Sequence, residues 1–155
     1  MKIYDCFQFF DENMILDLRL NILNDYVSKF IIVESTFLHS GVKKKPIFDI
    51  KNFSKFKDKI IYILVDNLPE GLHDINKIQN RDEKGNRTID NALMVEIAQR
   101  NSILKGLGEA QDDDLIIVSD VDEIPNLEDN DLKKNNKKLI HFKQKMYYYK
   151  FNLKY

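Results

Sequence analysis

The sequence lacks the features that mark disulfide-rich, membrane-spanning, secreted and nucleic-acid-binding proteins. Among its 155 residues there is one cysteine, Cys6, so no disulfide can form within the chain and a reducing compartment is expected. No apolar run approaches the roughly 18 residues of a membrane span, and the N-terminus lacks the pattern of a signal peptide. The formal net charge of -1 leaves no basic surplus for nucleic acid. We therefore expect a cytoplasmic protein without a membrane span or a nucleic-acid partner.

The composition is that of an ordinary globular domain. Hydrophobic residues make up 43% and charged residues 32% of the chain, whose length is enough for one domain with a substantial core. Runs rich in apolar and β-branched residues predict strands. The predicted strands are Lys2–Phe10, Lys29–Glu34, Lys59–Asp66 and Leu115–Ser119, with one or two more in Leu139–Tyr155. Helical patterns between them favour an α/β fold with a mostly parallel sheet flanked by helices.

The first helical pattern follows the first predicted strand. Asp11 is a suitable N-cap, and the apolar periodicity continues to about Asn24 or Asp25. Two neighbouring apolar stripes predict one wide face that packs on the core. These stripes are Met14, Leu18 and Ile22, and Leu16, Leu20 and Leu23.

A long polar segment precedes the second helical pattern. Leu68–Thr88 contains proline, glycine and many charges, and it is predicted to be an extended loop of the kind that often acts as a binding lid. The helix Asn91–Leu107 would then begin at a cap formed by Thr88 or Asp90. Its apolar face is predicted from Leu93, Ile97, Leu104 and Leu107. A shorter helical turn is predicted at Phe53–Asp58.

The segment Asp114–Pro125, DLIIVSDVDEIP, changes from apolar to acidic within one residue. Leu115–Ser119 has the uniform apolar character of a buried parallel strand, and Pro125 requires the strand to have ended. Asp120 and Asp122 therefore lie at the end of a sheet, where carboxylate oxygens suit a hard divalent cation that also holds a phosphate. An acidic solvated turn is the alternative, and this short motif alone does not decide between them.

Carboxylates end three of the predicted strands. Glu34, Asp66 and Asp120 each follow an apolar run at its carboxyl end. The carboxyl ends of parallel strands share one edge, and open α/β sheets bind their ligands in the crevice outside that edge. The pattern favours a binding site there, although strands must in any case end in polar residues.

Several blocks together resemble glycosyltransferase family 17. They are KIYDCFQFFDE at the N-terminus, VEST with HSG shortly after it, QRN in the second predicted helix, and SDVDEIP. The family is that of the β-1,4-mannosyl-glycoprotein β-1,4-N-acetylglucosaminyltransferase. The blocks occur in family order and span nearly the whole chain.

The resemblance implies a GT-A-like nucleotide-diphosphosugar transferase fold. It also implies UDP-GlcNAc as the donor, inverting transfer to the hydroxyl of a glycan or other sugar acceptor, and a divalent metal, Mn²⁺ or Mg²⁺. Asp120 and Asp122 match the aspartates that hold the metal against the donor diphosphate. Glu34 matches a position that contacts the uridine, and Arg100 and Asn101 match positions that reach the donor sugar or diphosphate.

Alternatives to these roles follow from the residues themselves. Glu34 is also the end of a strand, and Arg100 can pair with Glu96 one helical turn away. Glu123 is close to the aspartates, but no residue is assigned as the general base. A phosphotransferase or phosphatase with the same acidic motif is a weaker third interpretation.

The family's catalytic domains continue beyond the point that matches Tyr155. Residues 1–155 are therefore predicted to form a single donor-binding domain from which the acceptor half is largely absent. The alternative function is a truncated, catalytically inactive module that still binds a nucleotide sugar. An exposed sheet edge near Tyr155 would also favour self-association.

Overall fold

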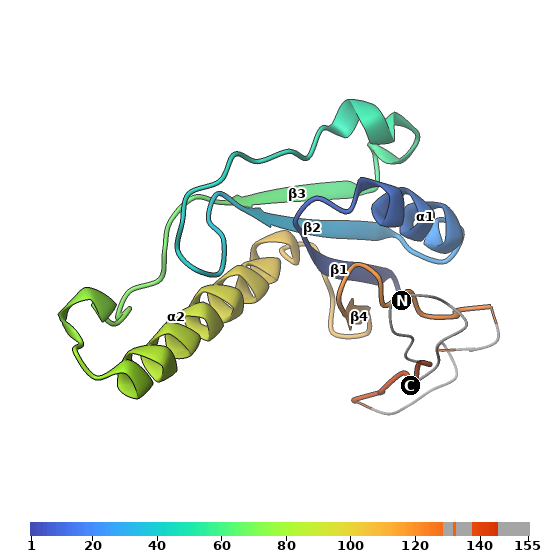
Figure 1. The fold of residues 1–155 in the computed structure, drawn as a ribbon. Helices are drawn as coiled ribbons and strands as arrows, with labels where there is room; N and C mark the ends of the chain where they lie inside the picture. The colour runs from blue at the N-terminus through green and yellow to red at the C-terminus, as the bar shows by residue number, and fades with distance from the viewer. Residues whose placement is uncertain (129–131, 133–137, 146–155) are drawn as a thin grey trace.

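The computed structural model describes residues 1–128, 132 and 138–145 (Figure 1). Within them, four parallel strands form one sheet in the order β3-β2-β1-β4. The strands are β1 (Ile3–Phe9), β2 (Lys29–Ser35), β3 (Ile60–Val65) and β4 (Leu115–Val118). The α/β fold with a parallel sheet is confirmed, and each of the four predicted strands is correct to within one residue at either end.

The predicted strands near the C-terminus have a different outcome. Residues 139–145 have no regular secondary structure, so none of the one or two strands predicted in Leu139–Tyr155 lies in those residues. Residues 146–155 lie outside the described residues, and with them lies the predicted sheet edge near Tyr155.

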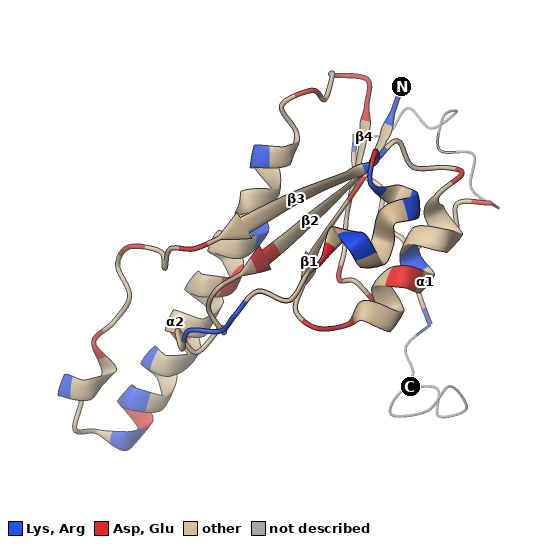
Figure 2. Ribbon diagram, turned by 90° about the horizontal axis from the view of Figure 1, so that it is seen from above, with Lys and Arg blue, Asp and Glu red and all other residues tan. Residues whose placement is uncertain are grey.

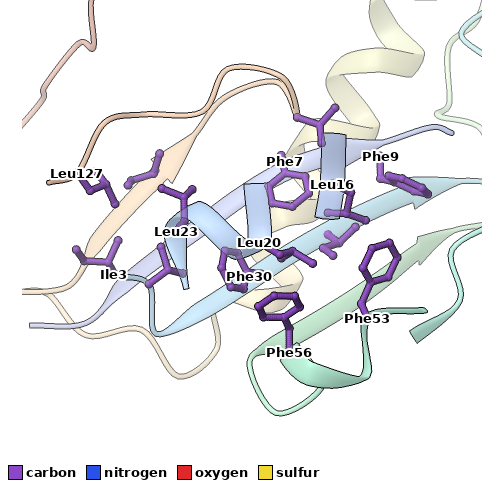
Figure 3. Close-up of a cluster of buried hydrophobic side chains, with 14 of the residues drawn as sticks. Ile3, Phe7, Phe9, Leu16, Leu20, Leu23, Phe30, Phe53, Phe56 and Leu127 are labelled. Atoms are coloured by element: carbon purple, nitrogen blue, oxygen red, sulfur yellow. The ribbon is translucent and has the colours of Figure 1, made fainter. Parts of the chain in front are cut away.

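One face of the sheet is covered by helix α1 (Asn13–Leu23) and the 3₁₀ segment η1 (Ile50–Phe56). Figure 3 shows their side chains meeting those of β1 and β2 in the main core cluster. Burial of a leucine side chain contributes about 2 kcal/mol, and Leu16, Leu20 and Leu23 of α1 are each fully buried. The main core therefore fixes α1 against the centre of the sheet.

The prediction of a wide apolar face on α1 is half wrong. Met14, Leu18 and Ile22 are exposed, because they lie on the side of α1 that faces away from the sheet. The predicted cap is also wrong: Glu12 occupies the N-cap position, and its carboxylate accepts hydrogen bonds from the backbone N–H groups of Phe10 and Asp11.

The other face of the sheet contacts the end of helix α2 (Arg81–Asn101) and the following 3₁₀ segment η3 (Ser102–Gly106). A smaller 3₁₀ segment, η2 (Ile75–Lys77), precedes α2. Helix α2 begins about ten residues earlier than predicted, so residues 81–88 are helix rather than loop. The cause is Asn80, whose side chain accepts the N–H groups of Asp82 and Glu83, both at 3.0 Å.

The predicted apolar face of the second helix is largely wrong. Leu93 and Ile97 of α2 and Leu104 of η3 are exposed, and α2 buries Val95 and Gln99 instead. Of the predicted face, Leu107 alone packs against the core. Figure 1 shows the cause: α2 reaches the sheet only at its C-terminal end and extends away from it over the rest of its length.

Polar contacts join α2 to the sheet. Gln99 donates to the carbonyl of Val33 at 3.2 Å, and Gln8 donates to the carbonyl of Glu96 at 3.0 Å. Figure 2 shows that charged residues are frequent on α2 and on the loops, whereas the strands carry few. In the part of the chain that the structure describes, no helix is long and apolar enough to cross a membrane.

Candidate functional site

The acidic segment after β4 forms a tight turn. Glu123 N–H donates to the carbonyl of Asp120 at 3.0 Å, and the carboxylate of Glu123 accepts the N–H of Asp120 at 3.1 Å. Between the two aspartates, Val121 is buried in the main core, whereas Asp120 and Asp122 are exposed. The apolar residue thus anchors the turn and leaves both carboxylates in solvent. We call residues 119–123 the acidic loop.

A buried arginine donates hydrogen bonds to the backbone of the acidic loop from the side of the core. Arg19 of α1 donates from Nη1 to the carbonyls of Asp120, Val121 and Glu123 at 2.7, 3.1 and 3.2 Å. The same side chain forms a bidentate ion pair with Asp5 of β1, at 2.7 and 2.8 Å. Both Arg19 and Asp5 are fully buried.

Sequence reasoning missed this pair, although a signal was present. Arg19 lies on the same stripe as Leu16, Leu20 and Leu23, and Asp5 is the one charged residue of β1. A charge on the core face of a helix and an opposite charge in a neighbouring strand indicate a buried ion pair.

A second arginine reaches the acidic loop from its exposed side. Arg100, at the end of α2, lies 3.0 Å from a carboxylate oxygen of Asp120 and 3.2 Å from one of Glu96. The predicted helix-face pair with Glu96 is therefore present, and the same guanidinium also reaches the loop. Asn101 is exposed at the last position of α2. The structure thus brings Arg100 and Asp120 together, on the neighbouring ends of α2 and β4.

A family model settles the identity that this arrangement suggests: the model of glycosyltransferase family 17 matches residues 1–155, the whole chain. The chain belongs to glycosyltransferase family 17. Comparisons with curated proteins and with solved structures found no match. The resemblance seen in the sequence is therefore confirmed. Glycosyl transfer is the activity for which this family is named.

Glu34 of this family 17 chain has a different setting from Asp120. Its side chain is fully buried, and its oxygens accept hydrogen bonds from Lys44 Nζ, the N–H groups of Ile47 and Phe48, and the Tyr62 hydroxyl, at 2.7 to 3.1 Å. Burial together with the bond to Glu34 raises the pKa of Tyr62 well above its usual range. The carboxylate of Glu34 thus ties the segment after β2 to β3.

The three acids at the carboxyl edge therefore do not form one cluster. Strand β1 separates Glu34 on β2 from Asp120 after β4, a separation of two strand spacings or roughly 10 Å across the sheet. Asp66 follows β3 at the outer edge and is exposed. Only Asp120 and Asp122 share a loop.

The donor set of the acidic loop fits a hard cation that is shared with a ligand. Two exposed carboxylates supply the oxygen ligands that Mg²⁺ and Mn²⁺ prefer. Among the residues that the structure describes, no group of three or more histidine, cysteine or acidic side chains is arranged to hold a metal. Asp120 and Asp122 are therefore the two carboxylates that the acidic loop offers to such a cation.

Proposed function

We propose that this family 17 chain is the donor-binding domain, GT-A-like in fold, of an N-acetylglucosaminyltransferase that uses UDP-GlcNAc. The observation that carries the proposal is the acidic loop, which presents Asp120 and Asp122 to solvent at the carboxyl edge of the sheet, beside Arg100. Ligands of open α/β sheets bind at this edge. The family match supports the glycosyl transfer, and the resemblance of the motifs supports the donor.

Each residue of the site has a role in this proposal. Asp120 and Asp122 bind Mn²⁺ or Mg²⁺, and Asp120 also faces the donor. Arg100 and Asn101, at the end of α2, bind the diphosphate or the sugar; an arginine suits a diphosphate because its guanidinium can donate two parallel hydrogen bonds. Glu34 acts through the segment that it anchors, since its oxygens already accept four hydrogen bonds.

The reaction transfers the sugar with inversion at its anomeric carbon. An acceptor sugar hydroxyl attacks this carbon, the bond to the diphosphate oxygen breaks, and UDP leaves with the electron pair while a general base takes the hydroxyl proton. The bound cation would neutralise charge that develops on the leaving diphosphate. Arg100, which lies beside Asp120, adds a permanent positive charge near the leaving diphosphate.

The Arg100–Asp120 ion pair has a consequence for binding. A cation at Asp120 and the guanidinium of Arg100 compete for the same carboxylate oxygen. The exchange is inexpensive, because Asp120 is 58% exposed and exposed ion pairs contribute only about 0 to 1 kcal/mol. Arg100 released from Asp120 would be free to contact the diphosphate that arrives with the metal.

The first test is calorimetric titration of the chain with UDP-GlcNAc, with and without Mn²⁺. We expect binding that requires the metal, and we expect Asp122→Ala to weaken it about a hundredfold or more, since even residues behind the ligands of a metal site change its affinity by about 10- to 100-fold. Asp112→Ala is the matched control, because it removes an exposed carboxylate from the turn before β4, at the opposite end of this strand. Unchanged binding by the Asp122 variant would remove the metal role.

A second candidate function is binding of the nucleotide sugar without transfer. It is favoured by the setting of Glu123, the acid closest in sequence to the two aspartates, whose carboxylate accepts the N–H of Asp120. A carboxylate engaged in this way is a poor general base for an acceptor hydroxyl. Release of UDP, measured with sugar acceptors and without them, separates the two functions: metal-dependent donor binding with no release in either case would favour the binding module.

A further inference from the structure

We propose that Arg19 is the positioning residue of the acidic loop, and that with Asp5 it sets the loop backbone in the conformation that binds the metal. The inference rests on the proposed function, because it concerns the same metal site. It is carried by contacts that neither the family match nor the sequence motifs assign to Arg19.

The hydrogen bonds of Arg19 are complete. Nε donates to Asp5, Nη2 donates to Asp5 and to the hydroxyl of Ser119, and Nη1 faces three loop carbonyls, so every N–H of the guanidinium has an acceptor. The guanidinium also lies over the ring of Phe7, 4.6 Å from its centroid. A lysine could not replace this set, because a single ammonium has fewer donors and no planar fork.

The direction of these bonds explains which way the aspartates face. The carbonyls of Asp120, Val121 and Glu123 accept hydrogen bonds from a buried group, and the side chain of Val121 is also buried. With the backbone oxygens and the middle side chain turned inward, the carboxylates of Asp120 and Asp122 are left on the outside. Ser119 adds a further link, since its hydroxyl accepts from Arg19 and donates to the carbonyl of Glu123.

The charge of Arg19 is compatible with a cation nearby because Asp5 neutralises it. An unpaired guanidinium beneath the acidic loop would oppose binding of a divalent ion. The bidentate pair with Asp5 removes that net charge and keeps the donors of Arg19 available to the loop. Loop order present before the metal arrives reduces the entropy that binding must overcome.

The test compares three variants by calorimetric titration of Mn²⁺ in the presence of UDP. Arg19→Lys keeps the charge but loses the fork, and Ser119→Ala removes one hydroxyl with little change in volume. Leu20→Ala is the control, because Leu20 is fully buried in α1 next to Arg19 and belongs to the core, and its apolar side chain cannot form a hydrogen bond with the acidic loop. Each variant is studied at a temperature where circular dichroism shows it folded.

We expect Arg19→Lys to weaken Mn²⁺ binding by about 10- to 100-fold, as for residues that orient metal ligands. Ser119→Ala removes the two hydrogen bonds of the hydroxyl and should weaken Mn²⁺ binding by about two- to tenfold for each of them. Leu20→Ala should leave the affinity unchanged although it destabilises the fold. If Arg19→Lys does not fold, Ser119→Ala decides in its place.

Hydrogen exchange provides a readout that does not require binding. The N–H groups of Asp120, Glu123 and Ile124 are hydrogen-bonded within the loop, so their exchange should accelerate in Arg19→Lys more than in Leu20→Ala. Affinity losses that follow global stability equally in all variants, or unchanged affinity in Arg19→Lys and Ser119→Ala, would overturn the inference. If the wild-type chain binds no metal with UDP, the proposed function fails, and hydrogen exchange still decides whether Arg19 orders the loop.

Discussion

The substitution Glu34→Gln tests whether this acid stabilises the fold from the end of β2. Each oxygen of Glu34 accepts two hydrogen bonds: one from Lys44 and Ile47, the other from Phe48 and Tyr62. A glutamine replaces one oxygen with an N–H₂ group, so two of these bonds are lost and two donors face another donor. At about 1 kcal/mol for each bond, and more for those left unpaired in a buried site, the loss is about 2 to 4 kcal/mol.

The assay is urea unfolding followed by circular dichroism, with Asp66→Asn as the matched control. Asp66 follows the adjacent strand β3 and is exposed, so its substitution should change the free energy of unfolding by less than about 0.5 kcal/mol. If Glu34→Gln lowers the free energy of unfolding by less than about 1 kcal/mol, Glu34 does not have this stabilising role. Loss of UDP affinity without loss of stability would instead favour the direct uridine contact predicted from the sequence.

Two further predictions concern the interior of the sheet. Burial and the neighbouring Asp5 raise the pKa of the Cys6 thiol to about 12, so native protein should resist alkylation near neutral pH. Above about pH 9 the thiol of the unfolded chain ionises, whereas the thiol of the folded chain keeps its proton. The free energy of unfolding should therefore fall by up to about 1.4 kcal/mol per pH unit. Cys6→Ala should show a shallower decline in the same titration. At Gly106, an added Cβ would lie 2.8 Å from a side-chain carbon of Ile31, so Gly106→Ala should lower stability by about 1 to 3 kcal/mol in urea unfolding, whereas Gly108→Ala, where space is open, should not.

The strands could be predicted from the sequence because each is a run of apolar and β-branched residues bounded by polar ones. The prediction that Leu115–Ser119 is a buried strand is wrong, however: β4 lies at the edge of the sheet, and Ile116 and Val118 are exposed. The beginning of α2 could not be predicted in the same way, because Gly85 and the surrounding charges are typical of a loop. The side chain of Asn80 caps the helix and fixes where it begins. Such a cap contributes about 1 kcal/mol, and a search for apolar periodicity does not detect it.

Periodicity also could not show which side of a helix faces the core. On α1 both stripes are apolar, and the buried one is the stripe that contains Arg19. Hydrophobicity alone would reject that choice, because the compensating charge, Asp5, lies in another element. The acidic motif itself was found from the sequence, since two aspartates beside an apolar strand are a local feature. The group that holds its backbone depends on tertiary contacts and could only be seen in the structure.

The central place of β1 in the sheet has a consequence for the order in which the chain folds. Tyr4 pairs with nearby Lys29, whereas Ile3 pairs with Leu115 from far along the chain. Closing the longer connection costs more chain entropy and slows folding, and during synthesis the N-terminal part emerges first. Arg19 and Asp5 can therefore pair well before β4 is made. We expect the last pairing, β4 on β1, to complete the hydrogen bonds of Arg19 and to create the acidic loop in the same step.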